Sequence, residues 1–314
     1  MIYCSNLCTE IAQNQSPTVT KQQYVKDGTI IIEKIPGDFV VCNLSSINLA
    51  RAVTDGVFER LIPIQLRMLD NVIDLNNIPV LQASLTNKKY RAVGLGTFGW
   101  HHLLALKGIR WESEEAVRYT DELYETIAYL VIQASMELAK EKGSYPGFSG
   151  SDWQTGAYFE RRGYKNHGER DWDRLKREVA RYGMRNGYLM AVAPNASTSI
   201  IAGSTASIDP IFRKVYAEEK KDYKIPVTVP DLNEQTTWYY KSAYYIDQRW
   251  SIRQNAARQR HIDQAISFNF YVMNTIKAKE LLELHLTAWK SGLKTTYYVR
   301  STSGTMEECD ACAS

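Results

Sequence analysis

Apolar residues recur at helical spacing in several parts of the chain, and these stretches predict helices. The longest begins at Ser113, a residue type favoured at helix starts, and its first turn carries Glu114 and Glu115, which suit the positive end of a helix dipole. It ends before Gly143, a residue type favoured just beyond a helix. Further helices are expected over residues 61–75, 97–108, 173–182 and 275–290, and in a Tyr- and Trp-rich stretch after residue 231.

Short apolar runs bounded by turn residues predict strands. They lie at residues 29–32, 39–42, 188–193 and 295–299. Residues 225–231 are rich in Pro and Asp and are expected to form a loop. The tail, residues 301–314, is small and polar without periodicity, which predicts disorder. Because strands alternate with helices along the chain, the pattern favours the α/β class.

The bulk composition narrows the function classes. The chain has 314 residues, of which 44% are hydrophobic and 23% charged, values typical of a soluble globular protein. A formal charge of +3 without a basic stripe argues against a nucleic-acid partner. No apolar run approaches the roughly 20 residues of a membrane span, and the first residues do not resemble a signal peptide. We therefore expect a cytoplasmic protein with no membrane partner.

The five cysteines are divided between the two ends of the chain: Cys4, Cys8 and Cys42 near the start, Cys309 and Cys312 in the last six residues. In a reducing compartment this odd number does not predict a disulfide framework. A zinc site would need a second ligand pair, which the sequence lacks, so no metal is expected. Cys309 and Cys312 form a C-x-x-C pair that a flexible tail could carry into thiol–disulfide exchange, unless the pair is incidental.

The segment around Cys8 combines three kinds of chemistry. If residues 5–11 are extended, Asn6, Cys8 and Glu10 lie on one face because side chains alternate along a strand. An amide can orient a polyol, a thiol can carry a hydrogen atom, and a carboxylate can take a hydroxyl proton. The alternative is a buried cysteine in an ordinary strand.

A second candidate site follows Pro194. Ser197, Thr198 and Ser199 stand where a helix is expected to begin, and free N–H groups at a helix start favour a phosphate. A plain Ser/Thr helix cap is the alternative.

The glycines of residues 94–99 fit the dinucleotide pattern G-x-G-x-x-G after an apparent strand at 90–93, which would suggest a nicotinamide oxidoreductase. The helix that follows, however, leads to another helix start at Ser113, where a second parallel strand should stand. The five histidines are scattered without metal-ligand spacing and are expected to have surface or core roles.

Four segments, in order, resemble the large subunit of class I ribonucleotide reductases. Residues 5–11 (SNLCTEI) resemble its finger loop, and residues 41–49 (VCNLSSINL) the segment that holds one cysteine of the redox pair. Residues 194–199 (PNASTS) resemble the substrate-phosphate loop, and residues 294–298 (KTTYY) the strand that bears a tyrosine pair. The resemblance covers nearly the whole chain.

The resemblance implies a role for each matching residue. Cys8 would be the transient thiyl radical, Glu10 the base on the ribose 3′ hydroxyl, and Asn6 a hydrogen-bond partner of the ribose. Cys42 would be one of two thiols that reduce the substrate. The phosphate loop would comprise Asn195, Ala196, Ser197, Thr198 and Ser199.

The same resemblance implies a radical relay and external partners. Tyr297 and Tyr298 would pass the radical to Cys8, and Cys309 and Cys312 would re-reduce the active site and be recharged by thioredoxin or glutaredoxin. The chain would hold no cofactor of its own and would depend on the metal and tyrosyl radical of a small subunit. The dithiol tail and the tyrosine pair favour class I.

Family members have several hundred residues before the finger loop. The resemblance therefore implies the second half of a ten-stranded α/β barrel over residues 1–299, with the finger loop at its N-terminus and a flexible redox-active tail over residues 300–314. A half-barrel exposes strand edges, so we expect an N-terminal large-subunit fragment as partner. The substrate would be a ribonucleoside diphosphate. A non-catalytic remnant subunit is the alternative from another class.

Overall fold

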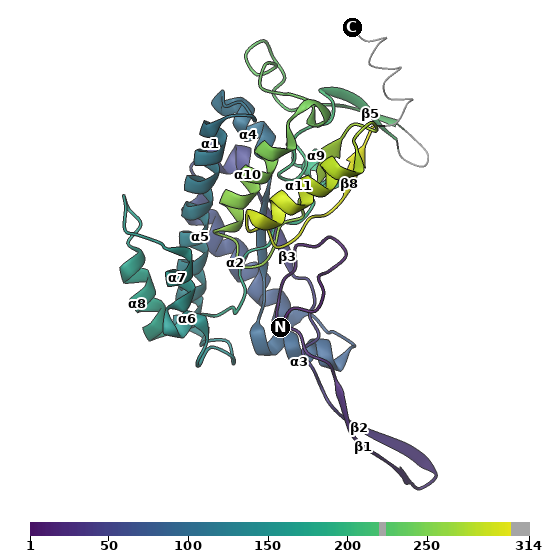
Figure 1. Cartoon of the computed structure of the whole chain (residues 1–314). Helices are drawn as coiled ribbons and strands as arrows, with labels where there is room; N and C mark the ends of the chain where they lie inside the picture. Colours follow the sequence, from purple (N-terminus) through teal and green to yellow (C-terminus); the bar gives the residue numbers. More distant parts are fainter. Residues whose placement is uncertain (220–223, 303–314) are drawn as a thin grey trace.

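The computed structural model describes residues 1–219 and 224–302, and its backbone combines helices with parallel strands (Figure 1). The strand β3 (Leu44–Asn48) pairs in parallel with β4 (Gly94–Phe98), and β7 (Phe270–Val272) pairs in parallel with β8 (Val299–Ser301). Parallel pairing needs a crossover between the strands, and helices supply it here. The α/β class is confirmed.

Extended segments continue this pairing from β4 across to β8. Leu95 N donates to Leu189 O at 2.8 Å, and Val192 N donates to Ala265 O at 3.1 Å. Parallel bridges join the same segments. The result is a row in chain order: β3, β4, residues 188–193, residues 265–272 and residues 297–301. The row does not close into a barrel within the described residues.

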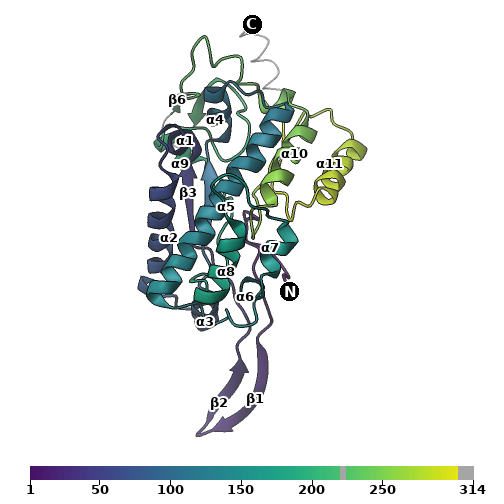
Figure 2. The ribbon, with the colours of Figure 1, turned by 90° about the vertical axis from the view of Figure 1, so that its left-hand side faces the viewer.

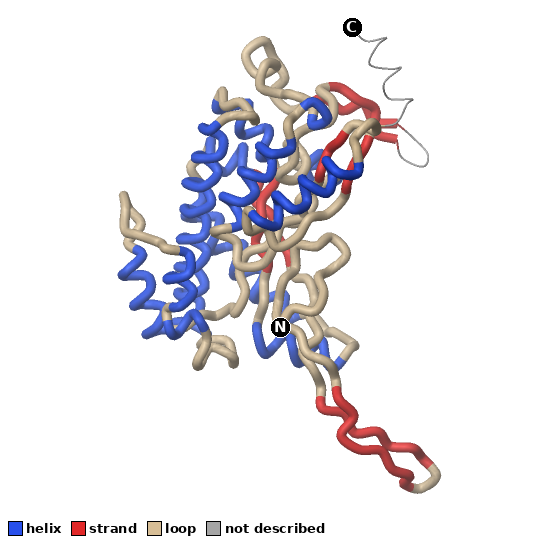
Figure 3. The backbone as a smooth tube through the Cα atoms, viewed as in Figure 1, coloured by secondary structure: helices blue, strands red, loops and turns tan. Residues whose placement is uncertain are grey.

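Helices fill the connections and pack against this row (Figure 3). They are α1 (Leu49–Thr54), α2 (Phe58–Leu75), α3 (Leu81–Tyr90), α4 (Trp100–Lys107), α5 (Glu114–Lys142), α6 (Asp152–Thr155), α7 (Ala157–Arg162), α8 (Trp172–Tyr182), α9 (Ser197–Ile201), η1 (Ala243–Tyr245), α10 (Gln248–Gln259) and α11 (Ala278–Lys290). The predicted helices at 61–75, 97–108, 113–143, 173–182 and 275–290 are confirmed, with small shifts of their ends.

The helix α5 is the centre of the core. The Ser113 side chain accepts from Ala116 N at 3.1 Å at its start, and Gly143 follows its end. Its apolar side chains are buried along most of its length, against α2, α8 and α10. Trp100 on α4 and Tyr124 on α5 itself are among the largest fully buried side chains.

A β-hairpin projects from the body (Figures 1 and 2); the strand predicted at 29–32 is confirmed as part of its second strand, whereas its first strand was not predicted. It pairs β1 (Val19–Lys26) with β2 (Thr29–Ile35) around Asp27 and Gly28, which both have positive φ angles of 50° and 74°. This geometry is that of a tight hairpin turn, for which Asp-Gly is a strong signal. The prediction of a strand at 39–42 is wrong, because Phe39 N donates to the Thr86 side chain on α3.

A second hairpin replaces part of the predicted loop at 225–231. The strand β5 (Val215–Glu219) pairs antiparallel with β6 (Lys224–Thr228), and Pro226 is tolerated because a two-stranded sheet has only edge strands. The predicted helix after residue 231 begins only at Gln248. Residues 234–239 form turns instead, and the Asn233 side chain accepts from the N–H groups of Gln235 and Thr236 there.

Gly94 and Gly96 lie in the buried strand β4, and Gly99 follows this strand directly as the N-cap of α4. The helix α3 ends at Tyr90, so the strand predicted at 90–93 is wrong, and β4 itself begins at Gly94. A Cβ added to Gly96 would lie 2.3 Å from the carbonyl oxygen of Ala191. The glycine serves close strand packing, which removes the basis of the dinucleotide interpretation. Within the described chain, no helix has the length and apolar character to span a membrane.

Candidate functional site

Residues 6–9 form a tight turn that presents Cys8. Thr9 N donates to Asn6 O at 3.1 Å, and Thr9 has a φ angle of 67°. The expected extended conformation is therefore wrong here: the Asn6 side-chain oxygen accepts from Ile11 N at 3.0 Å and closes the loop. Cys8 is partly exposed at this turn, while Glu10 behind it is only 1% exposed.

Ser267 bonds to both Cys8 and Glu10 of this turn. Its hydroxyl lies 3.0 Å from Glu10 Oε2 and is also within hydrogen-bond distance of the Cys8 carbonyl oxygen. Ala265 N donates to Glu10 O at 2.9 Å and ties the turn to the same segment. Ser267 was not among the predicted site residues, although a serine inside the apolar run 265–272 is a signal that could have indicated it.

The tyrosine pair meets the cysteine. The Tyr297 hydroxyl donates to the Cys8 sulfur at 3.6 Å, and the rings of Tyr297 and Tyr298 lie 3.9 Å apart between centroids. Hydrogen bonding to Tyr298, then burial and the contact with Cys8, hold the pKa of Tyr297 well above its ordinary value. The pair precedes β8, but Tyr297 N donates to Phe268 O at 2.7 Å, so the strand predicted at 295–299 is formed only in part.

Cys42 lies near the turn although it is 34 positions from Cys8 in the chain. The residue as a whole is exposed, but neighbouring parts of the chain shield its thiol from some of the solvent. This burial and the negative charge of Glu10 raise the pKa of Cys42, while a hydrogen bond from Asn6 opposes the rise. Asn6, Cys8, Glu10 and Cys42 thus interact in one place. Cys4, Cys8 and Cys42 are free thiols.

The segment after Pro194 begins a helix, as predicted. The helix α9 starts at Ser197, and no side-chain hydrogen bond caps it, which argues against the simple cap alternative. Ser197 and Thr198 are exposed, but the buried Ser199 hydroxyl donates to Ala196 O at 2.6 Å, so it is not a free donor as expected. Asn195 donates to Ser46 Oγ on β3 at 3.0 Å and fixes the loop to the strand row.

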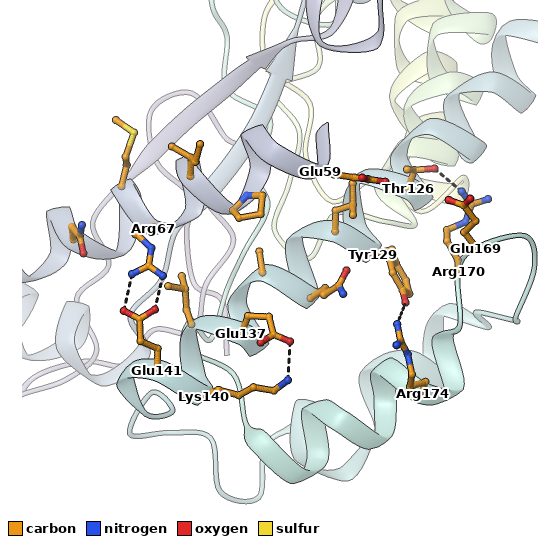
Figure 4. A pocket seen from close by; sticks show the side chains of 18 residues that line it. Glu59, Arg67, Thr126, Tyr129, Glu137, Lys140, Glu141, Glu169, Arg170 and Arg174 are labelled. Carbon is orange, nitrogen blue, oxygen red and sulfur yellow. Dashed lines mark hydrogen bonds and ion pairs between the residues drawn. The ribbon is translucent and has the colours of Figure 1, made fainter. Parts of the chain in front are cut away.

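The remaining site residues and a hollow lined by helices lie elsewhere. Cys309 and Cys312 fall outside the described residues. A hollow between α2, α5 and the start of α8 (Figure 4) has walls that are paired with each other, as in the ion pairs Arg67–Glu141 and Lys140–Glu137. It contains none of the predicted site residues. Ser301 and Thr302, which the sequence assigned to the tail, continue the pairing with β7.

Comparison with known proteins gives a consistent family. Residues 1–299 match the family model described as ribonucleotide reductase, barrel domain. The chain is 50% identical to the ribonucleoside-diphosphate reductase subunit alpha of Treponema pallidum, an alignment that covers 100% of this chain and 38% of that protein. It is 39% identical to the subunit of the same name from Helicobacter pylori, covering 98% of this chain and 45% of that protein.

A more distant relative extends the same pattern. The subunit of the same name from Bacillus subtilis is 30% identical, with 98% of this chain and 46% of that protein covered. The chain thus spans less than half the length of these relatives. Because the family model covers nearly all of the sequence, the chain belongs to the ribonucleotide reductase family, as its barrel domain.

Proposed function

We propose that the chain is the catalytic C-terminal portion of a class I ribonucleoside-diphosphate reductase large subunit, acting by a thiyl-radical mechanism. The observation that carries this proposal is the contact between the Tyr297 hydroxyl and the Cys8 sulfur at 3.6 Å. A tyrosine in hydrogen-bond contact with a cysteine can exchange a hydrogen atom with it directly. Glu10 and Cys42 beside that sulfur supply the base and the reductant that the reaction needs.

The radical would reach Cys8 through the tyrosine pair. An oxidised Tyr297 takes the hydrogen atom of the Cys8 thiol, which leaves a tyrosine hydroxyl and a thiyl radical. Tyr298, whose ring lies against Tyr297, passes the oxidising equivalent inward from the radical of the small subunit. The two tilted rings lie in contact, with centroids 3.9 Å apart, so the transfer spans a short distance.

The substrate chemistry then balances on the side chains of the site and one further thiol. The Cys8 thiyl removes the ribose 3′ hydrogen atom, and Glu10 takes the proton of the 3′ hydroxyl. The 2′ hydroxyl leaves as water with a proton from one thiol of the redox pair, and the other thiol supplies the hydrogen that replaces it on carbon 2′, so the pair gives two electrons and two protons and becomes a disulfide. Glu10 returns its proton to the 3′ oxygen. Cys42 is one of these thiols, and the other lies outside this chain. Cys8 finally returns a hydrogen atom to carbon 3′ and regains its radical.

The loop from Asn195 to Ser199 would hold the diphosphate. The N–H groups at the start of α9 have no partner in the helix, and the exposed hydroxyls of Ser197 and Thr198 can donate beside them. Asn6 would orient the ribose hydroxyls. These assignments rest on the family motifs together with the exposure of the loop.

The proposed partners follow from the part of the family that this chain spans. An N-terminal large-subunit portion would complete the barrel and supply the second thiol of the redox pair. A small subunit would provide the metal and tyrosyl radical. Thioredoxin or glutaredoxin would reduce Cys309 and Cys312, which would in turn reduce Cys42 and its partner. The support is that the chain covers 38% and 45% of two relatives named subunit alpha.

Ribonucleoside diphosphate reduction by the assembled enzyme tests the proposal. The chain is combined with a matching N-terminal portion and small subunit, as wild type, Cys8→Ser and Cys4→Ser. We expect activity in the wild type and in Cys4→Ser, since the thiol of Cys4 is exposed and bonds to the Gln15 side chain, and none in Cys8→Ser. An inactive but demonstrably assembled wild type would overturn the proposed reaction, and an active Cys8→Ser would overturn the thiyl assignment.

A further inference from the structure

A buried polar cluster stands directly behind the tyrosine pair. Asp209 is 6% exposed, and its Oδ2 accepts from Asn269 Nδ2 at 2.6 Å and from the Tyr271 hydroxyl at 3.4 Å. Asn269 and Tyr271 are themselves buried. Burying a carboxylate is unfavourable because its charge loses contact with water, unless hydrogen bonds or opposite charges compensate for that loss.

The cluster is bonded to the backbone of the tyrosine pair. Asn269 Oδ1 accepts from Tyr298 N at 3.1 Å, and Phe270 N donates to Tyr298 O at 2.9 Å. Asn269 therefore has its amide oxygen on Tyr298 and its amide nitrogen on Asp209. Two consecutive hydrogen bonds therefore connect the Asp209 carboxylate to the backbone of Tyr298 through the Asn269 side chain.

Asp209 determines which way the Asn269 amide faces. A carboxylate only accepts hydrogen bonds, so it selects the orientation that turns the Asn269 NH₂ group towards itself. The oxygen of the same amide is then turned towards Tyr298 N. With the opposite orientation, NH₂ would face a backbone N–H, and both groups would lose their partners.

Charged groups from neighbouring elements also face Asp209. Arg300 on β8 and the fully buried Arg258 on α10 both act on its charge, and Tyr244 of η1 packs against Tyr271 at 5.7 Å. Arg300 also lies over the Tyr298 ring, 5.2 Å from its centroid. The same guanidinium thus interacts with Asp209 and with the outer ring of the pair.

We propose that Asp209 is a positioning residue for the Tyr297–Tyr298 pair, acting through Asn269 and Arg300. The inference rests on the proposed function for its catalytic meaning, but its structural part stands without it. When Asp209 is charged, the Asn269 amide is locked and the backbone of Tyr298 is held at the end of the strand row. When Asp209 is absent, Tyr298 can shift relative to Tyr297; when Asp209 is protonated, its remaining acceptor oxygen can still bond to Asn269, but the orientation of the amide is no longer fixed by a pure acceptor.

The titration of Asp209 adds a functional signature. Burial raises the pKa of Asp209 to about 6, with Asn269, Arg300 and Tyr271 opposing the rise. As the pH falls below that value the carboxylate gains a proton and ceases to be a pure acceptor. We expect radical transfer to weaken on the acid side of the profile.

Hydrogen exchange tests the structural part without any assay of activity. The chain is compared as wild type, Asp209→Asn, Asp209→Ala and the control Asp263→Asn, an aspartate with a burial-raised pKa that accepts from Leu189 N and Met190 N. We expect the Tyr298 amide to exchange at least tenfold faster in Asp209→Ala. It should exchange within about threefold of wild type in Asp209→Asn, whose amide oxygen can still accept from Asn269, and in the control. Unchanged exchange in Asp209→Ala would overturn the proposal.

The pH profile of nucleotide reduction by the assembled enzyme tests the catalytic part. Wild type should lose activity as the pH falls through about 6, and Asp209→Asn should lack that inflection while keeping its KM. An unchanged inflection in Asp209→Asn overturns the inference, and it decides the matter even if Asp209→Ala does not fold. An inactive wild type with the expected exchange pattern would instead refute the proposed function and leave the positioning role supported.

Discussion

Replacing Ser267 with alanine should lower the free energy of unfolding, because it removes one buried hydrogen bond. The Ser267 hydroxyl bonds to Glu10 Oε2 at 3.0 Å and reaches the Cys8 carbonyl oxygen as well. Both Ser267 and Glu10 are 1% exposed, so water cannot replace the lost donor. The variant therefore leaves a buried carboxylate oxygen without this partner.

The size of the effect follows from the hydroxyl's single proton. Because the hydroxyl can donate to only one of the two oxygens at a time, one hydrogen bond is lost. A bond to a charged group contributes about 1.5–3 kcal/mol, so we expect the free energy of unfolding to fall by that amount. The matched control is Ser251→Ala, a serine that is also 1% exposed but accepts from the neutral Trp111 indole at 3.0 Å. That variant should lose about 1 kcal/mol.

Urea unfolding followed by tryptophan fluorescence measures both variants, and a double-mutant cycle assigns the loss. Glu10→Gln and Ser267→Ala are measured alone and together, and we expect a coupling of at least about 0.5 kcal/mol for residues in direct contact. Additive losses would refute the interpretation, since the hydroxyl would then serve only the Cys8 carbonyl. If Ser267→Ala loses no more unfolding free energy than Ser251→Ala, the larger value expected for a hydrogen bond to a charged group is refuted.

Three further results are expected from other parts of the chain. Tyr297→Phe, which removes the hydroxyl 3.6 Å from the cysteine sulfur, should reduce nucleotide reduction by the assembled enzyme to background while shifting the unfolding free energy by less than about 1 kcal/mol. Alkylation of Cys42 at pH 7 should accelerate in Glu10→Gln, because burial and then the charge of Glu10 raise the pKa of this thiol; an unchanged mass-spectrometric rate would contradict the electrostatic cause. Burial lowers the pKa of His101 from 6.5 to about 4, so the unfolded chain binds more protons than the folded chain between these two pH values. The unfolding free energy should therefore fall as the pH drops from about 6.5 to about 4, by up to about 3 kcal/mol. His101→Gln should flatten this dependence in denaturant titrations.

The helices were predictable because their signals are local. Ser113 and Gly143 mark the ends of α5 in the sequence, and the structure uses both as caps. The same holds for Gly108 after α4 and Gly183 after α8. A helix depends on residues three or four positions apart, so its pattern is contained in a short window.

The strands were less predictable because their partners are distant. Residues 39–42 have the composition of a strand, but their backbone bonds to a side chain on α3. The hairpin of β1 and β2 was missed even though Asp27 and Gly28 carry a strong turn signal, because β1 is largely polar. The turn at Asn6 is also not visible as a pattern, since a threonine with positive φ has no local signature.

The candidate site is assembled along the extended segment 265–272, and this explains why sequence motifs did not identify its supporting residues. Ser267 and Asn269 are two positions apart, so they lie on one face of the segment, while Phe268 and Phe270 lie on the other and are fully buried. One polar face thus reaches the cysteine turn through Ser267 and the tyrosine pair through Asn269. Alternation normally marks a strand with one face in water, yet both faces are buried here. Buried polar side chains are unfavourable unless they form hydrogen bonds, and these two bond to Glu10 in the cysteine turn and to Tyr298 in the tyrosine pair.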